Sequence, residues 1–103
     1  MADAIYEPEP AAIELGSVLD ALSDPMRLRM VAELHARGEV ICRTLGPAEM
    51  PKSTRSHHLK VLREAGLTRT RVEGTERHVR LRYTCLENRF PGLLESVLKA
   101  AAS

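Results

Sequence analysis

The sequence predicts a mainly helical domain with one small β-hairpin, in the order helix, helix, short helix, helix, hairpin, helix. The length of 103 residues fits a single domain. Aromatic residues make up only 3% of the chain, so the core must consist of aliphatic side chains and Met, a composition that favours helices packed on helices. Apolar residues recur at helical spacing between glycine and proline stop signals, whereas Val79, Leu81 and Tyr83 alternate as in a strand.

The N-terminal half contains a lead-in and two helices. Residues 1–10 hold two prolines and three acids and are expected to be flexible, with one domain over residues 11–103. A first helix is predicted from about Ala11 to Leu22, where leucine and valine form a stripe at helical spacing. Asp24 and Pro25 are typical of a helix start, and the second helix is expected to run to about Arg37 and end at Gly38.

The C-terminal half begins with a short connection, Glu39 to Pro47, that could hold a strand residue or two and one short helix. A helix is predicted from about Pro51 to Ala65, with Gly66 as its stop. Leu67 to Glu73 and Thr75 to Tyr83 are expected to form the hairpin, because Gly74 between them permits a tight turn. The last helix is predicted from about Pro91 to about Ala101. A basic exposed helix followed directly by a basic hairpin is the winged arrangement.

The charge is unevenly distributed along the chain. Residues 51–82 contain nine Lys or Arg and three acids, a net charge of +6, whereas the other residues carry 6 basic and 11 acidic side chains, a net charge of −5. A concentrated basic segment is what neutralisation of nucleic-acid phosphates requires. The alternative is a solvated charged face that binds nothing.

Two motifs identify a known family. The stretches LSDPMRLRMVAEL (Leu22 to Leu34) and KSTRSHHLKVLREAGLTRTRVEGTERHVRLR (Lys52 to Arg82) resemble the ArsR/SmtB family of bacterial winged helix-turn-helix regulators. The resemblance spans about Leu15 to Tyr83 and implies a homodimeric, sequence-specific transcriptional regulator of double-stranded DNA, expected to be a repressor of a pseudo-palindromic operator.

The resemblance makes the Pro51–Ala65 helix the recognition helix and the hairpin the wing. Arg55 is the best candidate for a guanine contact, since a guanidinium can bond O6 and N7 together, whereas Lys60 and Arg77 are expected to contact phosphates. Ser53 could instead cap the helix, and His58 could pack beside Leu59. The predicted DNA-binding residues are Lys52, Ser53, Thr54, Arg55, Ser56, His57, His58, Lys60, Arg71, Thr75 and Arg77. Arg63, Arg80 and Arg82 are expected to be solvated or paired within the chain.

The first and last helices have apolar faces larger than a core of this size easily covers. In the family they pair across a two-fold axis, which would place two recognition helices about 34 Å apart in successive major grooves. The alternative for about half of these residues is a place in the core of one chain. The predicted dimer interface consists of Leu15, Val18, Leu19, Leu22, Leu93, Leu94, Val97 and Leu98.

The ligand sets of the family's metal sensors are incomplete. Cys42 stands alone where thiolate sensors carry a cysteine pair, and Phe90 to Ser103 contain no His. We therefore expect no metal or other cofactor. Two alternatives remain open: a redox pair of the two cysteines, and a mixed metal site formed by Cys42, Cys85, His35 and His78. If neither exists, the cysteines have no functional role, and a partner protein, a small ligand or protein abundance would regulate the chain.

Other classes of protein are less consistent with the sequence. A winged-helix interaction module, or a partner-dependent co-regulator with weak DNA binding, is the second hypothesis, and the basic recognition face argues against it. No P-loop, nucleophile elbow, metalloprotease motif or carboxylate pair indicates an enzyme. The absence of a signal-peptide pattern or a long apolar run, together with the two cysteines, predicts a cytoplasmic protein without a membrane partner.

Overall fold

The first two α-helices form where local signals predict them. In the computed structural model, which describes residues 5–102, α1 spans Leu15–Leu22 and α2 spans Pro25–Arg37. The Asp24 carboxylate accepts hydrogen bonds from the backbone N–H groups of Met26 (2.8 Å) and Arg27 (3.0 Å), so it caps α2 as expected. The first helix is shorter than predicted, because a separate 3-10 helix, η1 (Pro10–Ala12), is followed by extended backbone at Ile13 and Glu14.

A three-stranded antiparallel sheet contains the predicted hairpin. β2 (Thr68–Glu73) pairs with β3 (Glu76–Leu81), and Gly74 and Thr75 make the two-residue turn between them. Gly74 has a φ of 61°, a conformation that glycine adopts without steric cost. A short strand, β1 (Val40–Ile41), pairs with the other edge of β3, and the 3-10 helix η2 (Cys42–Thr44) follows it, so the expected strand residues and short helix are both present.

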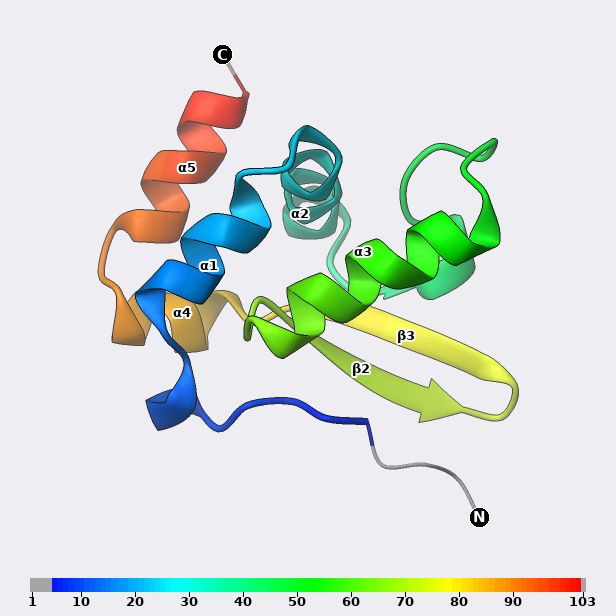
Figure 1. Cartoon of the computed structure of the whole chain (residues 1–103), viewed down its shortest axis with the longest axis horizontal. Helices are drawn as coiled ribbons and strands as arrows, with labels where there is room; N and C mark the ends of the chain where they lie inside the picture. The colour runs from blue at the N-terminus through cyan, green and yellow to red at the C-terminus, as the bar shows by residue number, and fades with distance from the viewer. Residues whose placement is uncertain (1–4, 103) are drawn as a thin grey trace.

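The remaining helices are α3 (Lys52–Glu64), α4 (Tyr83–Arg89) and α5 (Leu93–Ala101). Figure 1 shows α3 running across the hairpin, with α5 at the end of the molecule away from the hairpin turn. The sequence predicted α3 and α5 to within two residues but missed α4, because the alternation of Val79, Leu81 and Tyr83 extended the predicted strand into it. None of the helices formed by residues 5–102 is long and apolar enough to span a bilayer.

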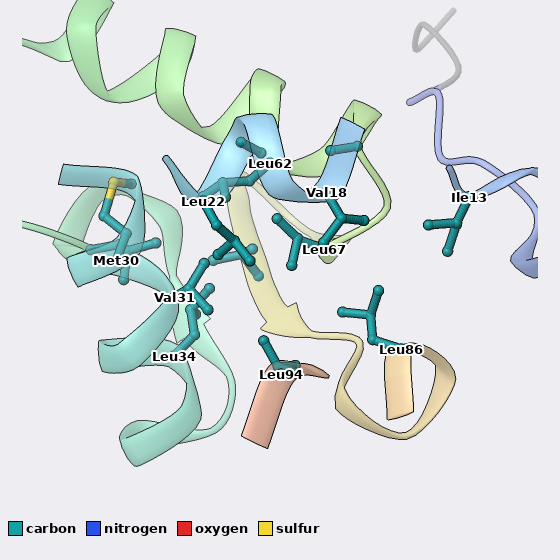
Figure 2. Packing of buried hydrophobic residues seen from close by; sticks show 14 of the residues in the cluster. Ile13, Val18, Leu22, Met30, Val31, Leu34, Leu62, Leu67, Leu86 and Leu94 are labelled. Carbon is teal, nitrogen blue, oxygen red and sulfur yellow. The ribbon is translucent and has the colours of Figure 1, made fainter. Parts of the chain in front are cut away.

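The core lies where the helices meet the sheet. α2 packs against β3 and α5, and α3 packs against β2 and α1. Aliphatic side chains and Met fill this space, as the composition predicted; Figure 2 labels Ile13, Val18, Leu22, Met30, Val31, Leu34, Leu62, Leu67, Leu86 and Leu94. Because Val18, Leu22 and Leu94 are at most 7% exposed in a single chain, their prediction as dimer-interface residues is wrong and the core alternative holds for them.

The N-terminal strap, residues 5–14, differs from the expected flexible lead-in. Its backbone carbonyls accept hydrogen bonds from arginines of the basic segment, Tyr6 from Arg63 (3.1 Å) and Pro8 from Arg82 (2.9 Å). The Glu7 carboxylate accepts a bond from the backbone N–H of Thr70 (2.6 Å), a donor on an edge strand. These contacts hold residues 6–8 against the domain; residues 1–4 of the predicted lead-in lie outside the described residues.

Candidate nucleic-acid interface

α3 presents an apolar face to the core and a polar face to solvent. Leu62 is buried and Leu59 is partly buried against the body of the domain. Short hydroxyl and imidazole groups lie on the exposed surface beside two lysines, an arrangement in which the short groups can approach base edges while the lysines reach phosphates. The exposed α3 residues from the predicted set are Lys52, Ser53, Thr54, Ser56, His57 and Lys60. Ser53 lies inside the helix, which begins at Lys52, and the N-cap residue Pro51 provides no side-chain cap.

Arg55 does not belong to the exposed face. Its side chain is only 9% exposed. Its Nε donates to the carbonyl of Leu45 and its Nη2 to the carbonyl of Pro47, both at 2.8 Å. The guanidinium therefore holds the connection before α3 in place, and the prediction that Arg55 reads a guanine is contradicted by its burial.

His58 also faces the protein. It is partly buried, and its Nδ1 lies 3.4 Å from Nη1 of Arg27, whose Nε donates to the carbonyl of Ala21. His58 thus packs against the corner between α1 and α2 rather than standing on the exposed face. The alternative of a packed histidine is the one that the structure supports.

The two wing arginines lie on opposite faces of the hairpin. Arg71 pairs in register with His78, and Arg77 pairs with Val72, so the alternation of the strands separates them. Arg77 and Thr75 lie on the side of the hairpin that faces α3, where they line a groove described below, as the DNA-binding prediction requires. Arg71 points away from α3 and forms ion pairs with Glu39 (2.7 Å) and Glu73 (3.3 Å), so the structure does not bring it to the recognition face.

The ion pairs of Arg71 shift the titration of both partners. The hydrogen bond from Arg71 lowers the pKa of the Glu39 carboxyl, and the same bond, with help from Glu73, raises the pKa of Arg71. Both groups therefore stay charged at neutral pH. His78 lies near the same two acids, 3.8 Å from Glu39 and 3.7 Å from Glu73, so Arg71 and these carboxylates occupy the part of this hairpin face next to His78.

A groove of about 660 Å³ separates α3 from η2 and the hairpin. Basic side chains from all three elements line it, and its lining includes Arg43, Lys52, Arg63 and Arg77. Arg43 was not predicted; it forms an ion pair with Glu76 near the wing turn. The groove lies beside the exposed face of α3, so basic side chains gather next to that face.

Cys42 lies in the same groove. Burial raises the pKa of its thiol, although the nearby charges of Arg77 and Arg63 act in the opposite direction. The thiol is therefore mainly protonated at neutral pH, which disfavours thiolate chemistry. Within residues 5–102 no group of three or more His, Cys, Asp or Glu side chains could hold a metal ion, so Cys42, Cys85, His35 and His78 are not brought together in one chain.

The remaining predicted interface residues are exposed to different degrees. Leu15 and Leu19 on α1 are 45% and 46% exposed. Leu93, Val97 and Leu98 on α5 are half-buried. The two helices therefore keep apolar surface that a single chain leaves uncovered.

Comparison with known proteins gives one consistent class. A family model described as a helix-turn-helix domain matches residues 22–71. An uncharacterized HTH-type transcriptional regulator of Bacillus subtilis, YceK, is 39% identical over 82 residues, which cover 78% of this chain and 82% of that protein. A cadmium resistance transcriptional regulatory protein, the CadC homolog of Staphylococcus aureus, is 33% identical over 60% of this chain, which spans about half (52%) of that protein.

Solved structures share the fold. The crystal structure of an ArsR family transcriptional regulator matches with a TM-score of 0.65 at 21% identity, covering 95% of this chain and 98% of that one. The transcriptional repressor BigR from Xylella fastidiosa matches with a TM-score of 0.57 at 28% identity, covering 74% of this chain and 85% of that one. The mainly helical fold with a small antiparallel sheet is thus the winged helix-turn-helix fold that the sequence predicted.

Proposed function

The chain belongs to the ArsR-like winged helix-turn-helix transcriptional regulators, which are not enzymes, and we propose that it acts as a homodimeric repressor whose two α3 helices read a pseudo-palindromic operator. The observation that carries this proposal is the exposed polar face of α3 beside the basic groove of the wing. The 13 residues of α3 make a helix of about 20 Å. A helix of that length, with its first turns exposed, fits the major groove of B-DNA.

The contacts of α3 and the wing with DNA would divide into two kinds. Ser56 and His57 in the exposed first turns would contact base edges, because their side chains are short enough to let the helix approach. Lys52, Lys60 and Arg77 would contact phosphates, since none of them has a carboxylate within ion-pairing distance among residues 5–102. Arg55 and Arg71 are not part of this proposal, because one is buried and the other is paired on the far face.

The dimer would form through the apolar surface of α1 and α5. Leu15 and Leu19 are the largest exposed apolar residues of α1, and α5 adds Leu93, Val97 and Leu98 at the end of the molecule away from the wing turn (Figure 1). Burial of this surface is favourable, and a two-fold axis there would leave both α3 helices free to face DNA. The name of the S. aureus relative raises cadmium sensing as an alternative, but the described residues of this chain supply no ligand cluster to support it.

Selection from random double-stranded DNA with the purified protein tests the proposal. We expect enrichment of a pseudo-palindrome with half-sites about one helical turn apart. The Ser56→Ala and His57→Ala variants should change the base preference, whereas Arg29→Gln, an exposed arginine on α2, should leave it unchanged. A failure to enrich any sequence at moderate salt would favour the interaction module, and a monomer at micromolar concentration in sedimentation would contradict the dimer.

A further inference from the structure

A second basic pocket lies away from α3, at the junction of the sheet and α4. Its volume is about 330 Å³, and its lining includes Arg69, Arg80, Arg82, Thr84 and Pro10. This volume is at the lower end of the range for small-molecule sites. Three arginines from β2, β3 and the start of the α4 segment therefore line one concave surface.

Two of these arginines face each other directly. Arg69 and Arg80 are cross-strand partners in the hairpin register, and both side chains are exposed on the same face. Like charges in directly opposed positions destabilise a sheet unless an anion lies near them. Glu7 of the N-terminal strap approaches Arg69 at 3.5 Å, but the same carboxylate also accepts the bond from the Thr70 backbone. For Arg80 the described residues supply no ion pair, and Glu39 acts on it only at longer range.

The third arginine is buried without a compensating charge. Arg82 is 6% exposed, and among residues 5–102 its guanidinium donates only to neutral groups, the Pro8 carbonyl (2.9 Å) and the Cys85 thiol (3.7 Å). Its Nε has no acceptor within residues 5–102. A buried cation that lacks an anionic partner is costly, and a negative charge in the adjoining pocket would offset that cost.

From this geometry we propose that the pocket binds a small oxyanion, the phosphate or carboxylate group of a small molecule. Arg69 and Arg80 would donate to its oxygens, the Thr84 hydroxyl would add a neutral donor, and the charge of Arg82 would lie beneath it. Guanidinium groups suit this task because their donors match the geometry of phosphate and carboxylate oxygens. This site is separate from the groove beside α3, so it does not depend on how the chain reads DNA.

Titration of the full chain with inorganic phosphate, and separately with succinate, tests the proposal by ¹H–¹⁵N NMR at constant ionic strength. We expect saturable shifts at the amides of residues 69, 80 and 82–84, and the tighter of the two probes identifies the oxyanion. Arg80→Gln, which removes an exposed side chain, should raise the Kd at least about tenfold, the equivalent of one charged hydrogen bond. Arg29→Gln, which removes the same charge from α2, should leave the Kd unchanged.

Three results would overturn the proposal. The first is the absence of saturable shifts with either probe, and the second is an equal loss of affinity in both variants, which would indicate only general charge attraction. The third concerns DNA: if Arg80→Gln lowers affinity for the selected operator and reduces its salt dependence, the arginines contact DNA phosphates instead of a small anion. Unchanged operator binding by Arg80→Gln, together with lost phosphate or succinate binding, would support it.

Discussion

Replacement of Arg55 distinguishes a structural arginine from a base-reading one. The side chain makes two hydrogen bonds of 2.8 Å from a charged donor, to the carbonyls of Leu45 and Pro47. Hydrogen bonds to charged groups contribute about 1.5–3 kcal/mol each, so Arg55→Ala should lower the free energy of unfolding by about 3–6 kcal/mol. For a domain of this size about 3 kcal/mol corresponds to a fall in Tm of roughly 12–24 °C.

The assay is thermal and urea unfolding at one fixed protein concentration, because dimerisation makes apparent stability depend on concentration. Lys60→Ala on the same helix is the matched control, and it should stay within about 0.5 kcal/mol of the wild type because its side chain is exposed. Arg55→Lys keeps the charge but cannot donate to both carbonyls with the planar geometry of a guanidinium, so its free energy of unfolding should lie between those of the wild type and Arg55→Ala. A variant that melts like the wild type, yet accepts other bases at one G·C pair of the operator, would refute this reasoning and restore the guanine contact.

Three further perturbations have equally definite outcomes. Gly66→Ala should lower the free energy of unfolding, measured by urea titration, by about 2–4 kcal/mol, because φ of Gly66 is +93° and the new Cβ would lie 2.6 Å from Ile13 Cγ1. The control is Gly16→Ala on α1, whose new Cβ would meet nothing within 4 Å, so this variant should be neutral or stabilising. Asp24→Ala should cost about 1 kcal/mol at neutral pH. The backbone bond from Arg27 lowers the pKa of this carboxyl below 3.8, so the stability it contributes is present above pH 3.8 and should disappear as the pH falls through the folded-state pKa. Urea titrations of the wild type and Asp24→Ala should therefore differ above pH 3.8 and converge well below it. Arg77→Gln should weaken binding to all DNA sequences alike and reduce the logarithmic salt slope by about two per dimer, as measured by fluorescence anisotropy; a change in base preference would contradict the phosphate assignment.

The parts of the fold with local signals were predictable. α2 begins and ends where predicted because a capping carboxylate and a glycine define its two ends within the sequence itself. α4 was not predictable in this way, since only Leu86 of its seven residues is buried and no apolar stripe marks it. The alternating apolar residues before it predict a strand correctly up to Leu81 but carry no information on where the strand stops.

The candidate site was predicted in outline but not residue by residue. The helical spacing that places Leu59 and Leu62 on the inner face also places Arg55 there, four residues before Leu59, so the helical pattern contained the signal for its burial. The separation of Arg71 from Arg77 depends on the hairpin register, which the turn fixes and which composition does not reveal. Pairing with Glu39, more than thirty residues away, depends on the tertiary fold alone.

The net charge of residues 51–82 therefore overstates the surface available to DNA. Arg55, Arg63 and Arg82 each donate to a backbone carbonyl that lies outside the regular helices and strands, and these bonds hold the connection before α3 and the N-terminal strap in place. A planar guanidinium can make several such bonds at once, whereas an ammonium group is a strongly hydrated point charge, and both lysines of the segment, Lys52 and Lys60, remain exposed. Positive charge in this chain thus serves two purposes, holding irregular segments and facing solvent, and the salt dependence of operator binding should follow the exposed lysines and Arg77 rather than the total count of basic residues.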